Sequence, residues 1–157
     1  MKLCSPGHIC AAGSISRYAE PCPPATYQDQ SGQSTCLTCP IGFYCLGATI
    51  HPISCPAGYW CDAGVFEPTA CPIGTFGANI ELGAEADCTD CTKGSYCAEP
   101  GISAPTDLCN AGFYCNVGSI IPEENDCPTG GYCEQGSFEK TSCPSGYYNE
   151  FTNMKTF

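Results

Sequence analysis

Six copies of one heptapeptide limit what this chain can fold into. Each copy runs cysteine, two residues, glycine, one residue, a large apolar or aromatic residue, and a second cysteine. A glycine at a constant offset predicts a turn that needs positive φ or a close backbone approach. The recurrence of the whole pattern is typical of tandem repeats. The copies occupy residues 4–10, 39–45, 55–61, 91–97, 109–115 and 127–133.

The glycine and the residue before the second cysteine have separate expected roles. We expect the aromatic to pack in a miniature core over the neighbouring sulfur, a contact of about 0.3–1.5 kcal/mol by analogy with methionine. The copy at 4–10 departs from the pattern, with Ile9 in place of the aromatic. The turn glycines are Gly7, Gly42, Gly58, Gly94, Gly112 and Gly130. The packing aromatics are Tyr44, Trp60, Tyr96, Tyr114 and Tyr132.

The cysteine content indicates the fold class. The chain has 17 cysteines among 157 residues, and a cysteine share above ~8–10% marks a disulfide scaffold. Chains of this kind replace a hydrophobic core with covalent cross-links. The sequence therefore predicts a small disulfide-rich fold: an elongated tandem array of cysteine-rich modules, mostly coil with short β-hairpins and no large core.

A longer element alternates with the heptapeptides. It opens at Cys22 and at Cys71, and it ends in Cys36-Leu-Thr-Cys39 and Cys88-Thr-Asp-Cys91. Cys143 opens a third copy whose closing cysteine does not follow within the sequence, so we expect a fragment of a larger secreted or surface protein. The predicted domains are the end of an upstream module at 1–21, a module with two heptapeptides at 22–70, a module with three at 71–142, and the truncated start of the next at 143–157.

Two disulfide schemes accommodate modules that differ in their number of heptapeptides. In the first, every heptapeptide closes on itself, and one further bond spans each long element. In the second, bonds span the connectors, and each Cys-x-x-Cys pair is left to bond or exchange. A mixture with crossed pairs in the first module is also open. We favour the first scheme, because it avoids strained Cys-x-x-Cys closure.

The two schemes differ in every pair. The first joins Cys4–Cys10, Cys22–Cys36, Cys39–Cys45, Cys55–Cys61, Cys71–Cys88, Cys91–Cys97, Cys109–Cys115 and Cys127–Cys133, and it leaves Cys143 unpaired. The second joins Cys10–Cys22, Cys45–Cys55, Cys61–Cys71, Cys97–Cys109, Cys115–Cys127 and Cys133–Cys143.

Charge and composition argue against several classes of partner. The formal net charge is −11, with only five lysines and arginines, which argues against nucleic acid and against anionic membrane surfaces. No stretch approaches the ~18 apolar residues of a membrane span. The sequence contains no Asn-x-Ser/Thr acceptor, so no N-glycosylation is predicted, whereas its many Ser and Thr leave O-linked glycans open.

We find no pattern that indicates a metal, a cofactor or catalysis. The Cys-x-x-Cys pairs are too far apart for a two-pair zinc site, and His8 and His51 lack ligand spacing. The acidic run at 123–126 lacks the EF-hand pattern of calcium ligands and is interpreted as a solvated loop. No Ser/His/Asp arrangement, Cys/His arrangement or glycine-rich phosphate loop is present. We therefore predict no enzyme, and we interpret both histidines as surface or packing residues.

The long element carries a family resemblance. Cys71-Pro-Ile-Gly-Thr-Phe, followed by Cys88-Thr-Asp-Cys91, resembles the ephrin-receptor-like cysteine-rich repeat, in the style of tumour-necrosis-factor-receptor and EGF-like modules. The Gly-Phe-Tyr-Cys heptapeptides are similar to those beside this repeat in large protist and algal surface or mastigoneme-type proteins. The resemblance covers the chain from Cys4 to Tyr148. It implies an extracellular or cell-surface protein of many modules, and no ligand-binding residue carries over.

The resemblance and the repeats together indicate a structural function. We expect a component of an extracellular assembly, such as a surface filament, a flagellar hair or a wall. Its partners would be proteins, through self-association or contact with other surface or filament subunits. The alternative is the stalk or ligand-binding region of a cell-surface receptor or adhesin. The variable number of heptapeptides departs from the receptor families and favours the structural interpretation.

Overall fold

The structure is a computed structural model that describes residues 2–157. The chain divides into two compact units. The first unit comprises the residues up to Thr69 together with Asn79–Asp87, and the second comprises Ala70–Ala78 together with Cys88–Phe157. The chain therefore crosses from the first unit to the second, returns for one short segment, and crosses again.

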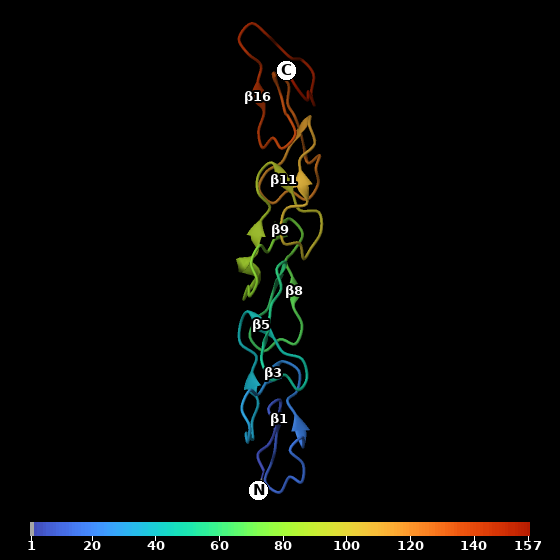
Figure 1. Ribbon diagram of the computed structural model, residues 1–157. Coiled ribbons are helices and arrows are strands. Elements are labelled where there is room, and N and C mark those ends of the chain that lie inside the picture. The colour runs from blue at the N-terminus through green and yellow to red at the C-terminus, as the bar shows by residue number, and fades with distance from the viewer. Residues whose placement is uncertain (1) are drawn as a thin grey trace. The chain divides into compact units, whose positions relative to one another are not determined.

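Short antiparallel strand pairs make up the regular structure of the first unit. Each hairpin joins the two residues before a second-cysteine position to two residues shortly before the next first cysteine. In Figure 1, β1, β3 and β5 follow one another along this unit in chain order. The pairs are β1 (His8–Ile9) with β2 (Glu20–Pro21), β3 (Thr26–Tyr27) with β4 (Leu37–Thr38), and β5 (Phe43–Tyr44) with β6 (Ile53–Ser54). Beyond them lie β7 (Tyr59–Trp60), β8 (Thr69–Ala70), which ends in the second unit, and the 3₁₀ helix η1 (Glu85–Asp87).

The second unit is built in the same way. The labels β9, β11 and β16 follow one another along it in Figure 1. The pairs are β9 (Thr75–Phe76) with β10 (Thr89–Asp90), β11 (Ser95–Tyr96) with β12 (Asp107–Leu108), β13 (Phe113–Tyr114) with β14 (Asn125–Asp126), and β15 (Gly131–Tyr132) with β16 (Thr141–Ser142). Strands of two residues are too short to be stable alone, so other contacts must hold each hairpin.

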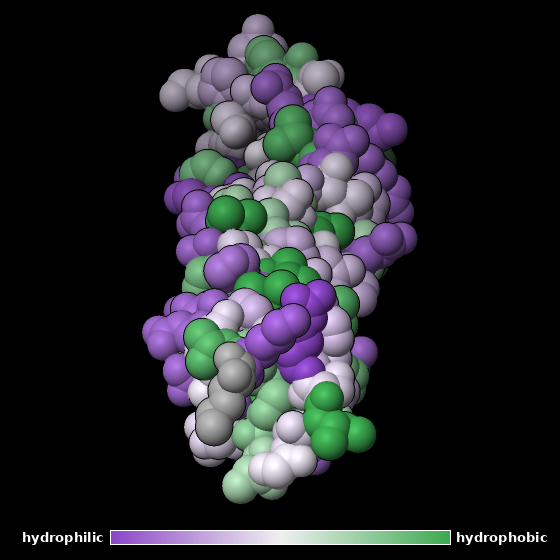
Figure 2. All heavy atoms as spheres, turned by 60° about the horizontal axis from the view of Figure 1, so that its bottom comes forward, coloured by the Kyte–Doolittle hydropathy of each residue, from purple (hydrophilic) through white to green (hydrophobic). Residues whose placement is uncertain are grey.

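Cysteine forms the core of both units. Among residues 2–157, the buried hydrophobic side chains are thirteen cysteines, twelve of them no more than 1% exposed. Large apolar side chains are instead exposed at many separate positions, and on the face shown in Figure 2 they are interspersed with hydrophilic residues. The prediction of a small disulfide-rich fold, mostly coil with short hairpins and no large core, is confirmed.

Helix is almost absent from the described chain. The three-residue helix η1 follows a turn in which the Asp87 carboxylate accepts hydrogen bonds from the Gly83 and Ala84 N–H groups, both at 2.9 Å. Within residues 2–157, no helix combines the length and the apolar character that a membrane span requires.

Candidate functional site

Eight disulfides cross-link the chain, and they join the same pairs as the first scheme above. The Cα–Cα distances lie between 5.8 and 6.0 Å, within the usual range for disulfides. Among the described residues Cys143 is the free cysteine. In the chain-entropy treatment, closing a loop of about seven residues stabilises the fold by about 2 kcal/mol. Because these loops are local, they hold individual heptapeptides and do not join one heptapeptide to the next.

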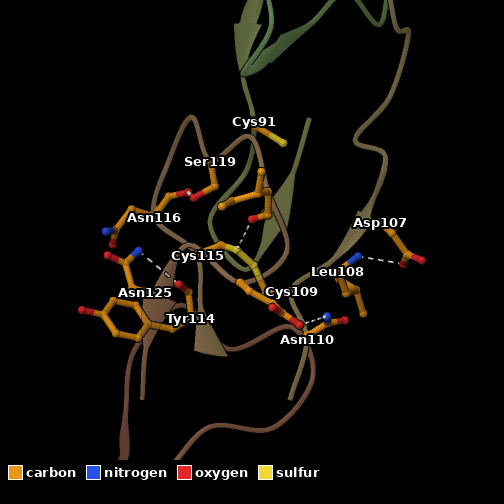
Figure 3. Close-up of a disulfide and its surroundings, with 12 residues drawn as sticks. Cys91, Asp107, Leu108, Cys109, Asn110, Tyr114, Cys115, Asn116, Ser119 and Asn125 are labelled. Carbon is orange, nitrogen blue, oxygen red and sulfur yellow. Dashed lines mark hydrogen bonds between the residues drawn. A yellow bond between two sulfur atoms is a disulfide. The ribbon is translucent and has the colours of Figure 1, made fainter. Parts of the chain in front are cut away.

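Figure 3 shows the heptapeptide that the Cys109–Cys115 disulfide closes. Asn125 donates a hydrogen bond from Nδ2 to the Tyr114 carbonyl at 3.2 Å, which ties the two strands of the hairpin together. The Tyr114 ring points away from the sulfurs in this view. Adjacent residues of an extended strand point to opposite sides, so the expected position over the neighbouring sulfur does not hold for Tyr114.

The packing aromatics of the heptapeptides are intermediate in exposure, neither fully buried nor fully exposed. Each lies in the first strand of its hairpin and is half-buried. The residues concerned are Tyr44, Trp60, Tyr96, Tyr114 and Tyr132.

All six turn glycines have positive φ, between 76° and 94°. The long elements make the same turn at the equivalent position, with Gly74 at 83° and Gly146 at 92°. Ala25 also adopts it, at φ 73°, although the left-handed region costs an alanine about 1–2 kcal/mol. The long elements therefore have the same turn as the heptapeptides, and the chain consists of nine turns of one kind. We name each repeat by its first cysteine: Cys4, Cys22, Cys39, Cys55, Cys71, Cys91, Cys109, Cys127 and Cys143.

The turn residue binds the next repeat through both of its main-chain polar groups. In the Cys109 repeat, Gly112 donates its N–H to the Cys133 carbonyl at 2.8 Å, and its own carbonyl accepts from the Cys127 N–H at 3.0 Å. The first of these bonds recurs at 2.7–3.1 Å between the pairs Gly7 and Gln28, Ala25 and Cys45, Gly42 and Cys61, Gly74 and Cys97, Gly94 and Cys115, and Gly130 and Asn149.

Two more bonds run to the connector that follows the next repeat's second-cysteine position. Gly136 donates its N–H to the Cys109 carbonyl at 2.9 Å, and Cys115 donates its N–H to the Ser137 carbonyl at 3.1 Å. Four main-chain bonds thus join the Cys109 repeat to the Cys127 repeat. The connector donors in the successive repeats are Gly32, Ala48, Gly64, Glu81, Gly101, Gly118, Gly136 and Asn153, and every one of them has positive φ.

The sequence pattern marked this second turn only in part: the early glycines of several connectors, such as Gly64, Gly101 and Gly118, indicate turns. Its positions are occupied by glycine, alanine, glutamate and asparagine, so no single residue type marks them. The one available signal was the glycine that many connectors carry three or four residues after the second-cysteine position. The connector turn contributes as many bonds to the repeat interface as the predicted turn glycine.

The connector of one repeat also lies against the turn glycine two repeats earlier. A Cβ added at Gly112 would stand 2.8 Å from the Asn153 carbonyl oxygen, and one added at Gly74 would stand 2.8 Å from the Gly118 oxygen. Real Cβ atoms do not approach an oxygen so closely, so only glycine fits at these positions without displacement of the backbone. The close approach explains why glycine is present at nearly every turn.

The second-cysteine position is not always a cysteine. In the three long elements Gln28, Gly77 and Asn149 stand there, and the first cysteine bonds to Cys36 or Cys88 further along. The main chain of Gln28 still makes both of the inter-repeat hydrogen bonds that a second cysteine makes. Its carbonyl accepts from the Gly7 N–H at 2.7 Å, and its N–H donates to the Thr49 carbonyl at 3.1 Å. The main-chain hydrogen bonds between repeats are therefore independent of the disulfide pattern.

The remaining sequence candidates do not come together in a site. Within residues 2–157, no group of three or more His, Cys, Asp or Glu side chains is placed to hold a metal ion. His8 packs edge-on against Tyr18, with ring centroids 5.1 Å apart, and His51 is exposed. Glu123, in the acidic run, accepts a hydrogen bond from Asn110 Nδ2 at 2.9 Å.

The described chain thus offers a repeated backbone interface as its candidate functional feature. Main-chain bonds hold each repeat to the next within a unit, and a disulfide cross-links every described repeat except the Cys143 repeat. The chain matches no protein-family model. A comparison with curated proteins found none with significant similarity to it.

Proposed function

We propose that the chain is a structural component of an extracellular assembly, such as a surface filament, a flagellar hair or a wall. The number of disulfides indicates an extracellular or secreted protein, because disulfides persist in oxidising compartments. The proposal assigns no enzymatic activity to the chain. The resemblance of the long element to the repeats of cysteine-rich surface proteins supports the proposal.

One observation carries the proposal: within each unit, successive repeats are joined by the same four main-chain bonds whichever side chains are present. In the second unit the set is complete between the Cys109 and Cys127 repeats, and Ala25 and Gln28 preserve it in the first unit. Stability then accumulates from repeat to repeat, as in other linear arrays. Such a chain can be lengthened without loss of order, which suits a structural element.

Electron microscopy of the native extracellular material, prepared without reductant and labelled with an antibody to this chain, tests the proposal. Labelled regular filaments or sheets are expected, and they should loosen when a reductant opens the disulfides. Labelled single molecules, dispersed and attached to one partner, would overturn the proposal and favour the receptor or adhesin stalk. An assembly that stays intact after complete reduction would contradict the role of the disulfides.

A further inference from the structure

One segment inside the Cys71–Cys88 loop belongs to the first unit. This segment, Asn79–Asp87, is preceded by Ala78 and followed by Cys88, and both of these residues belong to the second unit. The Cys71–Cys88 disulfide joins the chain on one side of the segment to the chain on the other, with Cα atoms 5.8 Å apart. We name Asn79–Asp87 the strap.

Main-chain hydrogen bonds hold the strap to the rest of the first unit. Glu81 donates its N–H to the Cys55 carbonyl at 2.8 Å, and the Leu82 carbonyl accepts from the Cys61 N–H at 2.9 Å. Leu82 also forms a parallel β-bridge with Trp60. The strap therefore occupies main-chain groups at both ends of the heptapeptide that the Cys55–Cys61 disulfide closes.

Side chains of the first unit also contact the strap. Ser54 donates a hydrogen bond from Oγ to Glu81 Oε1 at 2.7 Å. Gly83 is buried and lies close to Ile41, because a Cβ added at Gly83 would stand 2.6 Å from Ile41 Cγ1. Ile41 is already 58% exposed, and displacement of the strap would expose it further.

The loop that carries the strap lacks the side-chain support that the other long element has. In the first long element, Gln28 holds the loop through hydrogen bonds to the Thr35 carbonyl and from the Gln30 N–H. Gly77 stands at the equivalent position of the second long element and has no side chain. The hairpin at the base of this loop pairs β9 with β10, and strands of two residues are not stable alone. The Cys71–Cys88 disulfide is therefore the main restraint on the loop.

This disulfide is also accessible to a reductant. Cys88 is half-buried, whereas both cysteines of the neighbouring Cys55–Cys61 and Cys91–Cys97 bonds are no more than 1% exposed. Cys71 is 0% exposed. An attacking thiolate would therefore reach the Cys88 sulfur, and Cys71 would be the leaving thiolate.

We propose that the Cys71–Cys88 disulfide is a redox switch, which holds the strap in place when oxidised and releases it when reduced. A dithiol supplies the two electrons. One of its thiolates displaces Cys71 from Cys88, and its second thiolate then displaces Cys88 from the mixed disulfide. The dithiol leaves as a disulfide, and the two cysteines take up its two protons. A disulfide reagent reverses both exchanges.

Release of the strap changes the surface that the first unit presents. The Cys55 carbonyl and the Cys61 N–H lose their partners, and Trp60 loses its bridge to Leu82. Ile41 becomes more exposed at the same time. An apolar surface beside a free main-chain donor and a free main-chain acceptor is then accessible under reducing conditions only. The inference goes beyond the proposed function and does not depend on it.

Amide hydrogen exchange of the whole chain, measured by NMR, tests the switch. In the double variant Cys71→Ser, Cys88→Ser, the Glu81 and Cys61 amides should exchange on the order of a hundredfold faster than in the parent chain. The chain-entropy model gives this factor for the loss of a cross-link around a loop of about this size. The Gly64 amide, which bonds elsewhere in the same unit, should keep its exchange rate.

The first long element supplies the matched control. The double variant Cys22→Ser, Cys36→Ser removes a comparable cross-link, with a sequence separation of 14 against 17. It leaves the strap and its own disulfide unchanged. The Glu81 and Cys61 amides should therefore exchange at the parent rate in this variant.

Trp60 gives a second readout, because it is the only tryptophan of the chain and its main chain is bridged to the strap. Titration of the parent chain with dithiothreitol should increase the quenching of Trp60 fluorescence by acrylamide as Cys71–Cys88 opens. Alkylation and mass spectrometry identify the bond that has opened. Oxidised glutathione should restore both the bond and the original quenching.

Three outcomes of the exchange measurement would overturn the inference. The first is parent-like exchange at Glu81 and Cys61 in a folded Cys71→Ser, Cys88→Ser variant. The second is an equal acceleration at Gly64, which would indicate unfolding of the whole unit. The third is the same acceleration at Glu81 in the control variant.

The titration decides if the Cys71→Ser, Cys88→Ser variant does not fold. Unchanged quenching of Trp60 in a chain whose Cys71 and Cys88 are both alkylated would overturn the inference as well. Increased quenching that appears with the opening of this bond, and before the opening of any heptapeptide disulfide, would support it.

Discussion

The side-chain amide of Gln28 donates a hydrogen bond from Nε2 to the main-chain carbonyl of Thr35 at 2.8 Å. Its Oε1 accepts from the Gln30 N–H at 3.1 Å, and the side chain is 4% exposed. Gln28 stands where the heptapeptides have their second cysteine, so an amide supplies here the local cross-link that a disulfide supplies elsewhere. The loop it holds leads to Cys36, which bonds to Cys22.

Replacement of Gln28 by alanine should destabilise the first unit. The variant removes the hydrogen bonds to the Thr35 carbonyl and from the Gln30 N–H, each of which typically contributes about 0.5–1.5 kcal/mol to stability. Thermal unfolding under non-reducing conditions measures the loss. Gln30→Ala is the matched control, because that side chain is exposed and its removal should change stability by less than about 0.5 kcal/mol. Equal effects of the two variants would contradict the assigned role of Gln28.

The double variant Gln28→Cys, Cys36→Ser should convert the first long element into an ordinary heptapeptide. The main chain of residue 28 already makes the inter-repeat hydrogen bonds of a second cysteine, so we expect Cys22 to form a disulfide with the new cysteine. Peptide mapping of the oxidised protein by mass spectrometry identifies the pair. If Cys22 instead remained free in a folded product, the equivalence of the two kinds of repeat would be wrong. Cys36→Ser alone, which leaves Cys22 without a partner, serves as the control.

Alanine at Gly112 should be much more harmful than alanine at Gly118. Both positions have positive φ, at 94° and 81°, so each variant suffers the cost of about 1–2 kcal/mol for a left-handed residue. Only at Gly112 does the added Cβ also meet a carbonyl, that of Asn153, and overpacking adds about 1–3 kcal/mol. Thermal unfolding of the two variants compares them directly. Similar stabilities would show that the connector can move away from the turn at little cost.

Graded reduction should open the two long-element disulfides before the heptapeptide disulfides that follow them. Cys36 and Cys88 are half-buried, whereas both cysteines of the Cys39–Cys45 and Cys91–Cys97 bonds are 0% exposed. A thiolate must reach a sulfur atom to attack it, so the more accessible sulfurs of the long-element disulfides should be reduced first. Alkylation with one reagent before full reduction and another after it, read by mass spectrometry, gives the order. Simultaneous opening of all bonds would indicate global unfolding instead.

The same measurement counts the free thiols. Before any reductant is added, we expect one alkylated cysteine per chain of 157 residues, at Cys143. The second disulfide scheme pairs Cys143 with Cys133 and would protect it.

The amino-acid sequence was sufficient to predict the fold class, because the turns and disulfides that define it depend on local chemistry. A turn at Gly112 requires positive φ, and two cysteines six residues apart around such a turn are brought to 6.0 Å. Glycine and cysteine are the residue types that perform these roles, so they mark the positions in the printed chain. The orientation of Tyr114 was predicted less well, because strand alternation decided it and not attraction to sulfur.

Only the tertiary structure showed that the long elements and the heptapeptides are one kind of repeat. Ala25 takes the place of a turn glycine, Gln28 takes the place of a cysteine, and Asn153 serves as a connector turn. The bonds that make these residues equivalent join main-chain N–H and carbonyl groups of different repeats. Every residue type except proline carries both groups, so the hydrogen bonds between repeats leave no signature in the sequence beyond the glycines of the turns. Residue type therefore predicted the turn within most repeats, and main-chain hydrogen bonding decided how the repeats stack.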